Sequence, residues 1–278
     1  MPQPYKRVIF THPSTLTFRR RMKILFLIVF LLAFNCHAAE TQAELTINQG
    51  HTQRVLTDKD FQQLHRAEIE IQDLVYHKRK RYAGYWLSEV FGLADVQLDP
   101  KAIWVFTALD GYQARVTVAD VLRSGAKAFV TVKDLDAPDW EKIKQGKEWV
   151  SPAPYYLVWQ SPAQVPKDIK LPWPYQMVGI SVEYADETQQ KLAGFKVFQQ
   201  NCMSCHSLNL EGGTLGPELN VPRNILEYQD RKFLKEFIGN PSSFRANSKM
   251  PAFNDVLSSQ ELDDLFDYLE WMGKHKKD

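Results

Sequence analysis

The segment from Asn201 to Ser207 reads NCMSCHS and brings two thiols and an imidazole close together in the chain. In the order Cys-x-x-Cys-His, the cysteines lie one helical turn apart and the histidine directly follows the second cysteine. Thiols at this spacing can form thioether bonds to the two vinyl groups of one haem, while the imidazole coordinates its iron. The motif therefore predicts one covalent haem c at Cys202 and Cys205, with His206 as an axial ligand.

Other uses of the two cysteines fit the sequence less well. A disulfide between residues this close would constrain little of the unfolded chain. A thioredoxin-like dithiol should follow a strand in a βαβ unit. A zinc site needs two further ligands, and the only histidine after His206 is His275 in the terminal tail. We therefore interpret the motif as a haem attachment site.

A sixth iron ligand is also predicted from the sequence. Met250 stands in the loop-like segment NSKMPAF, where its thioether could reach the iron. Of the other methionines, Met203 lies inside the attachment loop, Met272 falls on the apolar face of a terminal helix, and Met177 precedes the module. Pro217, in a helix-breaking Gly-Pro segment, offers a carbonyl that can hold the second ring nitrogen of the histidine.

Two helices are expected to enclose this site. The first covers residues 187–201, with apolar residues at helical spacing and Gly194 among them, which allows another helix to approach closely. The second begins near Ser258, which stands three residues before Glu261 as in a capping box, and it carries one apolar stripe.

On these residues, 187–275 resemble a class I cytochrome c. The points of resemblance are CMSCH, the Gly194 and Phe198 pair, Gly216–Pro217, Met250–Pro251 and the helix face from Leu265 to Leu269. The resemblance implies an all-α domain over residues 187–278, with His206 proximal and Met250 distal to a low-spin haem iron. It also implies single-electron transfer, because both axial positions are filled by protein and catalysis at the haem is not expected.

Residues 42–183 have a different texture, with short β-branched and aromatic runs separated by turns, which predicts an α+β, mostly β, domain. We expect a first hairpin over residues 44–56 and a short helix that begins at Thr57, capped with Asp60. Further strands are expected at 104–106, 113–118, 128–132 and 155–159.

Several stretches of this segment resemble the molybdopterin-binding domain of the sulfite oxidase family. They are RYAGYWLSEVFGLADV, ALDGYQARVTVADVL, PAPYYLVW and LPWPYQMVGISVEY. Enzymes of that family hold molybdenum through a cysteine thiolate, and residues 41–201 contain no cysteine. The resemblance therefore implies the fold, and neither a metal site nor a bound molybdopterin is expected.

Two local features of the β-rich segment leave room for interpretation. The run HKRKRY at residues 77–82 is either a solvated edge strand that discourages sheet pairing or a docking patch for an anion or a partner. The tryptophans of this segment are expected to pack in the core and turns. They are Trp86, Trp104, Trp149, Trp159 and Trp173.

The amino terminus has the order of a signal peptide. Residues 19–39 contain a basic start, an apolar run from Ile24 to Phe34 and small residues, so cleavage is expected after Ala38 or Ala39. The apolar run is shorter than the ~20 residues of a spanning helix, so no permanent membrane span is expected. We expect residues 1–39 to comprise an upstream extension and a signal for the general secretory route to the periplasm, and residues 184–190 to link the two domains.

The whole chain is 44% hydrophobic, which indicates a globular protein. Its net charge of +1 creates no overall positive potential that would attract nucleic acid. The leading hypothesis is an electron carrier that exchanges electrons with periplasmic redox proteins, while the first domain docks partners or regulates. The alternative is a periplasmic oxidoreductase in which the first domain binds a pterin or another cofactor and the haem is its electron exit. The sequence leaves open whether the chain is an enzyme in its own right.

Overall fold

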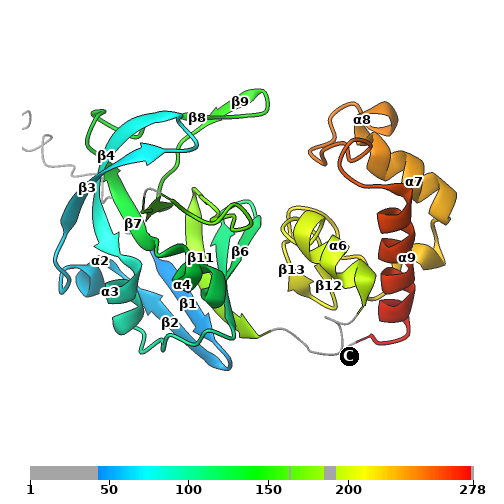
Figure 1. The fold of residues 1–278 in the computed structure, drawn as a ribbon, viewed down its shortest axis with the longest axis horizontal. Helices are drawn as coiled ribbons and strands as arrows, with labels where there is room; N and C mark the ends of the chain where they lie inside the picture. The colour runs from blue at the N-terminus through cyan, green and yellow to red at the C-terminus, as the bar shows by residue number, and fades with distance from the viewer. Residues whose placement is uncertain (1–42, 163, 185–191, 277–278) are drawn as a thin grey trace, which may run out of the picture. The chain divides into compact units, whose positions relative to one another are not determined.

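The computed structural model describes residues 43–162, 164–184 and 192–276. The predicted signal peptide and all of the predicted linker except Tyr184 lie outside these residues. The described chain comprises a β-rich region, residues 43–184, and a helical region, residues 192–276 (Figure 1). The predicted succession of a mostly β segment and a helical segment is confirmed, whereas the boundary at residues 184–190 stays a prediction.

The β-rich region contains two main sheets. The first has the strand order β2-β1-β11-β5-β6, in which β1 and β11 run parallel and the other neighbours antiparallel. Its strands are β1 (Leu45–Gln49), β2 (Thr52–Leu56), β5 (Ala102–Ala108), β6 (Gln113–Thr117) and β11 (Met177–Tyr184). The second sheet is antiparallel, with the order β10-β7-β4-β3. Its strands are β3 (Ala67–Asp73), β4 (Lys78–Trp86), β7 (Lys127–Asp134) and β10 (Tyr156–Gln160).

Three short helices and a separate hairpin complete this region. The helices are α2 (Asp58–Phe61), α3 (Leu87–Gly92) and α4 (Val118–Ser124), and the hairpin is formed by β8 (Ile143–Gln145) and β9 (Glu148–Val150). The predicted capping box of Thr57 and Asp60 is present at α2. The expectation for Val118 is wrong: this residue begins α4 and does not end a strand. The Thr117 hydroxyl caps the helix, because it accepts a hydrogen bond from Asp120 N at 3.1 Å.

Strand β10 of the second sheet is buried on both faces. Along β10, Leu157 and Trp159 belong to the main core, which also holds side chains of the first sheet, whereas Tyr156 and Val158 belong to a separate apolar cluster. This alternation follows the two-residue period of a strand. Since each face packs against other side chains, β10 reads as the continuous apolar run YLVW.

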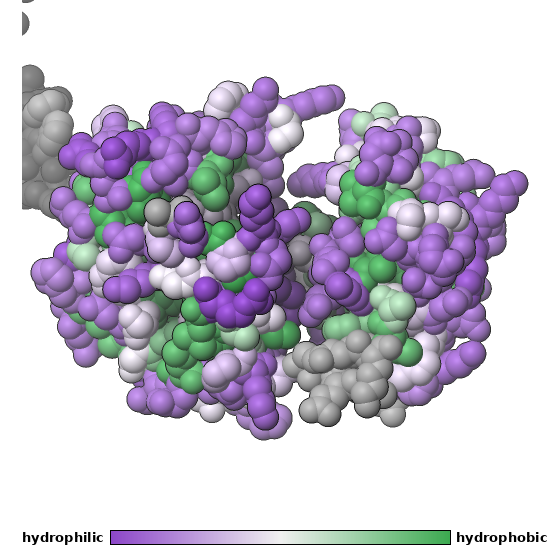
Figure 2. All heavy atoms as spheres, in the orientation of Figure 1, coloured by the Kyte–Doolittle hydropathy of each residue, from purple (hydrophilic) through white to green (hydrophobic). Residues whose placement is uncertain are grey.

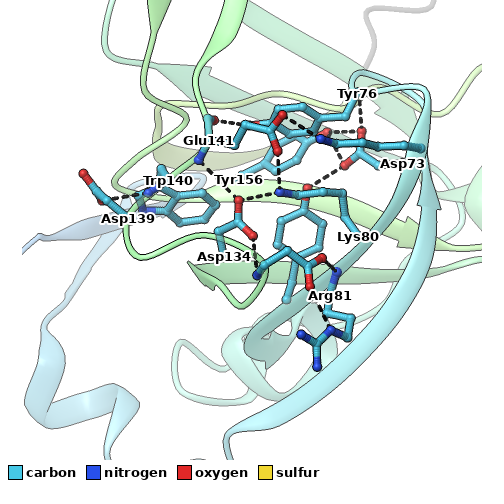
Figure 3. A network of polar contacts seen from close by, with 12 residues as sticks. Asp73, Tyr76, Lys80, Arg81, Asp134, Asp139, Trp140, Glu141 and Tyr156 are labelled. Atoms are coloured by element: carbon cyan, nitrogen blue, oxygen red, sulfur yellow. Dashed lines mark hydrogen bonds and ion pairs between the residues drawn. The ribbon is translucent and has the colours of Figure 1, made fainter.

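The edge-strand interpretation of the basic run at residues 77–82 is wrong, whereas the docking-patch interpretation stays a prediction. The run enters β4, which is an interior strand paired with β3 on one side and β7 on the other. Lys80 is only 1% exposed and its ammonium lies 2.5 Å from the Asp134 carboxylate and 2.9 Å from Glu141 (Figure 3). The alternate arginines point to the exposed side and form ion pairs there. The charge of Lys80 is therefore paired inside the fold, whereas the two arginines are paired at the surface.

The expectation for the tryptophans is confirmed at four positions and wrong at one. Trp104 and Trp159 are buried, and Trp86 and Trp173 are partly buried against the apolar clusters. Trp149, on β9, is 62% exposed. It does not pack in the core.

The helical region is built around two helices that cross closely. Its elements are α6 (Ala193–Asn201), the 3-10 helix η2 (Ile225–Glu227), α7 (Arg231–Gly239), α8 (Pro241–Phe244), α9 (Ser259–Gly273) and the short strands β12 (Ser207–Leu208) and β13 (Glu211–Gly212). The predicted capping box of Ser258 and Glu261 starts α9. The domain was expected to be all-α, and the two short strands β12 and β13 differ from that expectation.

Gly194 permits the crossing of α6 and α9, as its position in the sequence predicts. A Cβ atom at Gly194 would lie 1.9 Å from the carbonyl oxygen of Asp264 and 2.6 Å from the Tyr268 Cβ. Phe195 and Phe198 pack on the Tyr268 ring from the same helix, with centroids 5.8 and 6.0 Å apart. The missing side chain therefore sets the distance between the two helices.

Replacement of Gly194 by alanine is expected to lower the free energy of unfolding by about 1–3 kcal/mol, because the helices must separate to admit a methyl group. Chemical denaturation followed by far-ultraviolet circular dichroism measures the change. Gly239→Ala is the matched control: that helical glycine would meet only the Asn254 Cβ at 3.9 Å. Equal denaturation midpoints for Gly194→Ala and wild type would contradict the argument.

Candidate haem site

A cavity of about 870 Å³ lies in the helical region. Its walls are mostly apolar side chains from α6, α7, α8, α9 and the connecting segments. All five predicted site residues line it: Cys202, Cys205, His206, Pro217 and Met250. Cofactor pockets span roughly 300–1,000 Å³ and have mainly apolar linings, so the cavity has the size and character of such a pocket.

The chain turns sharply after α6 and presents the two thiols. Cys202 N donates to the carbonyl of Phe198 at 2.8 Å, which continues the helical pattern by one residue. Cys205 N and His206 N then both donate to the Cys202 carbonyl, at 3.0 and 2.9 Å. Burial raises the pKa of the Cys202 thiol to about 12, with a smaller contribution from Cys205. The compact turn accounts for both cysteines lining the same cavity.

His206 is held in one orientation. Its Nδ1 lies 2.8 Å from the Pro217 carbonyl oxygen, so Nδ1–H donates and the Nε2 lone pair stays available for a metal. Gly216 allows the contact, because a Cβ there would lie 2.5 Å from the imidazole Cε1. Burial lowers the pKa of His206, against a smaller raising effect of the Pro217 hydrogen bond. The neutral ring is the form that ligates metal.

Three asparagines, one before Pro217 and two after it, tie this part of the chain to α9 and to the residues that directly follow α9. The side-chain amides of Asn209, Asn220 and Asn224 donate to the carbonyls of His275, Met272 and Leu269, at 2.9, 2.9 and 2.8 Å. The Met272 carbonyl also accepts from His275 N at 2.9 Å, so the asparagine amide adds a second hydrogen bond there. The amides also bond to one another, Asn220 to Asn209 at 2.6 Å and Asn224 to Asn220 at 2.7 Å.

The sequence interpretation missed these asparagines as positioning residues. The available signal was the placement of polar, turn-favouring asparagines around a helix-breaking Gly-Pro segment. That signal identifies a loop and does not identify its partner helix. The contacts to α9 arise only when the chain folds.

Met250 lies in the segment between α8 and α9 and is partly buried. Its backbone N–H donates to the Ser248 hydroxyl at 3.2 Å, and Phe253 N donates to the Ile238 carbonyl at 3.1 Å, which holds the segment against α7. Among the described residues that line the cavity, Met250 is the one methionine. Met272 is buried in the helical core, as predicted.

An aromatic wall of the cavity was not predicted from the sequence. Phe233, Phe237 and Phe244 form a triangle of rings with centroids 5.5–6.0 Å apart, and all three line the cavity. The spacing of Phe233 and Phe237 on one helix face, with Asp230 as N-cap, was the signal. These rings add apolar surface suited to a flat macrocycle.

The donor set fits haem c. A neutral imidazole with an oriented second nitrogen and a soft thioether are ligands of iron in c-type sites, and two thiols one turn apart match two vinyl groups. Elsewhere in the described residues, no group of three or more His, Cys, Asp or Glu side chains is arranged to hold a metal ion.

The fold and the cavity define a c-type cytochrome domain, and comparison with known proteins agrees. The profile of the family described as cytochrome c matches residues 192–273. Through this domain, the chain belongs to the cytochrome c family. That assignment establishes haem c and electron transfer as the chemistry of the domain.

Two curated relatives of this chain are named as subunits of nitric oxide reductase. The one from Stutzerimonas stutzeri is 35% identical over 94 residues, which covers 32% of this chain and 63% of the relative. The one from Halomonas halodenitrificans is 31% identical over 104 residues, covering 35% of this chain and 68% of the relative. The matched part thus spans about two thirds of each relative and about one third of this chain.

The face of the described chain in Figure 2 carries both hydrophilic and hydrophobic residues. Within residues 43–162, 164–184 and 192–276, no helix is long and apolar enough to cross a bilayer.

Proposed function

We propose that the chain is an exported c-type cytochrome that transfers single electrons through one haem c. In this proposal Cys202 and Cys205 carry the thioether bonds, and His206 and Met250 are the axial ligands. The observation that supports it is the joint lining of one apolar cavity by two thiols, the oriented imidazole and a methionine. Haem held here would change its charge by one electron with both axial positions occupied by protein.

The residues of this chain have separate tasks in that transfer. The Pro217 carbonyl holds the His206 tautomer and would keep the ring in one position toward a bound haem. The apolar walls exclude water and limit the reorganisation that accompanies electron transfer. A thioether from Met250 favours the reduced iron and raises the reduction potential.

The partners in this proposal are periplasmic redox proteins. Both relatives are named as subunits of a reductase, which supports a role as an electron-transfer component beside a separate catalytic protein. The β-rich region would then serve docking or regulation, with electrons entering from a dehydrogenase or quinol-linked complex.

For residues 42–183 we propose a sulfite-oxidase-like architecture without the metal. The lack of any cysteine in residues 41–201 supports this, because no thiolate is available for molybdenum. Metal and pterin analysis of the purified, exported protein tests it: iron without molybdenum is expected. Stoichiometric molybdenum, or haem reduction by a small substrate alone, would favour an oxidoreductase instead.

Replacement of Met250 by leucine tests the distal ligand. The ferric wild-type protein is expected to be low-spin and to show a methionine-to-iron charge-transfer band at the red end of its visible spectrum. Met250→Leu should lose that band and lower the reduction potential, because leucine has no donor atom. Met203→Leu is the control and should keep both properties. A variant at position 250 that retains the band would exclude Met250 as the ligand.

A further inference from the structure

The β8–β9 hairpin is a small element that stands out from the β-rich region (Figure 1). Among the described strands, β8 and β9 pair only with each other, in the register Ile143–Val150, Lys144–Trp149 and Gln145–Glu148. Since side chains alternate across a strand, Ile143 and Val150 share one face, and Lys144 and Trp149 share the other. Ile143 is 6% exposed and Trp149 is 62% exposed, so the second face points to solvent.

Basic side chains surround the exposed indole. Lys142 precedes β8 by one residue and falls on the same face as Lys144, while Lys147 lies at the turn, and all three are exposed. None of the three lysine side chains forms a hydrogen bond or ion pair with another described residue. The hairpin's one acid, Glu148, pairs with Gln145 and therefore lies on the opposite face. The outward face, Lys142, Lys144, Lys147 and Trp149, is thus cationic with an apolar centre.

The base of this hairpin is rigidly held (Figure 3). Glu141, which comes just before Lys142, accepts from Lys78 at 2.7 Å and from Lys80 at 2.9 Å through its carboxylate. Its backbone carbonyl accepts from the Tyr76 hydroxyl, and its N–H donates to Asp134 at 3.3 Å. The outward face is therefore presented in a fixed position, which reduces the ordering cost of binding.

We propose that this outward face docks onto an anionic phospholipid surface. Trp149 would enter the headgroup region, where the amphipathic indole is favoured. Lys142, Lys144 and Lys147 would lie against the lipid phosphates while their stems cover apolar surface. A specific protein interface buries about 800 Å² on each partner, which two three-residue strands do not provide, whereas a few side chains suffice on a bilayer. The proposal is independent of the haem site.

Co-sedimentation with vesicles tests the proposal on the full, haem-loaded protein. Vesicles of phosphatidylcholine alone are compared with vesicles that also contain phosphatidylglycerol, at low and high salt. Wild type is expected to partition to the anionic vesicles and to be released by salt. Each lysine contributes about five-fold near such a surface, so Lys142→Gln, Lys144→Gln and Lys147→Gln together should weaken partitioning by roughly a hundred-fold. Trp149→Ala should weaken it by about ten-fold.

Matched controls separate this face from general charge and from the amino terminus. Lys59, Lys101 and Lys167 are exposed lysines of the same region, and their triple glutamine variant removes the same charge. Leu98, 58% exposed, supplies the apolar control Leu98→Ala. All variants have the same amino-terminal sequence, so any binding through that segment is common to them.

The outcomes are distinct. Loss of anionic partitioning in the hairpin variants but not in the controls supports the proposal. Equal partitioning of hairpin variants, controls and wild type overturns it. Equal partitioning of the wild type to vesicles with and without phosphatidylglycerol also overturns it. If lipid has no effect but Trp149→Ala slows electron exchange with a redox partner, the face binds a protein and the lipid assignment is wrong.

Discussion

Replacement of Cys202 and Cys205 together by alanine is expected to abolish covalent haem attachment completely. The two thiols line the cavity from one compact turn, in which Cys205 N and His206 N share the Cys202 carbonyl. Without sulfur, no thioether can form, and haem held by its axial ligands alone dissociates when the chain is denatured. Mass spectrometry of the denatured protein, matured in a haem-attaching host, measures the loss of the haem mass.

Ser204→Ala is the control for this variant, because it changes the same loop and keeps both sulfurs. It should attach haem as wild type does. Each single cysteine variant should retain one thioether at most. Wild-type protein with both thiols unmodified after maturation in such a host would overturn the attachment site, and the proposed electron carrier with it.

Replacement of Lys80 by methionine is expected to lower the free energy of unfolding by about 3–5 kcal/mol. The side chains of Lys80 and Asp134 are 1% and 0% exposed, and their charged atoms lie 2.5 Å apart. Removal of the ammonium leaves the Asp134 carboxylate buried without its counter-ion, which costs more than the pair contributes. Chemical denaturation followed by far-ultraviolet circular dichroism gives the difference in stability.

A second variant and a control make this interpretation specific. The double variant Lys80→Met with Asp134→Asn removes both buried charges and should recover much of the stability. Arg81→Met breaks the more exposed ion pair with Asp136 and should cost at most about 1 kcal/mol. If Lys80→Met and wild type unfold at the same denaturant concentration, the buried pair does not have the assigned role.

The pH range of this effect follows from the pKa of Lys80. Burial lowers that pKa, but the hydrogen bonds to Asp134 and Glu141 outweigh it and raise the pKa above its ordinary value. A raised pKa in the folded state means that the stabilisation is complete below the ordinary lysine pKa and is lost as pH rises through the folded value. The difference between wild type and Lys80→Met should therefore persist through neutral pH and shrink in strongly alkaline solution.

Local features of this protein could be predicted from the sequence because their partners are near in the chain. The CMSCH motif places two thiols and an imidazole together whatever the rest of the fold does. The capping boxes at Thr57 and Ser258 need only three residues of separation, and both are present. Gly194 predicted a close helix crossing, because a glycine on an apolar helix face lets the backbone of a second helix approach closely.

Other features were decided by contacts between distant residues. The basic run at 77–82 was interpreted as an edge strand or a docking patch. In the fold, β7 pairs with β4 on the side opposite β3 and brings Asp134 to Lys80, 54 residues away. The sequence of β9 does not indicate that the face of the hairpin carrying Trp149 lacks a packing partner. Burial depends on which strands become neighbours, and composition does not encode that choice.

The haem site shows both contributions together. The sequence alone determined which atoms can bond to haem, because thiol, imidazole and thioether chemistry belongs to Cys202, Cys205, His206 and Met250 as residue types. Only the tertiary structure decided that these atoms line one cavity and that Pro217 orients the imidazole. It also decided that three asparagines on either side of Pro217 bond to α9 and the residues just after it. The physical reason is that ligand identity is a property of each side chain, whereas cavity walls and hydrogen bonds require segments far apart in sequence to pack together.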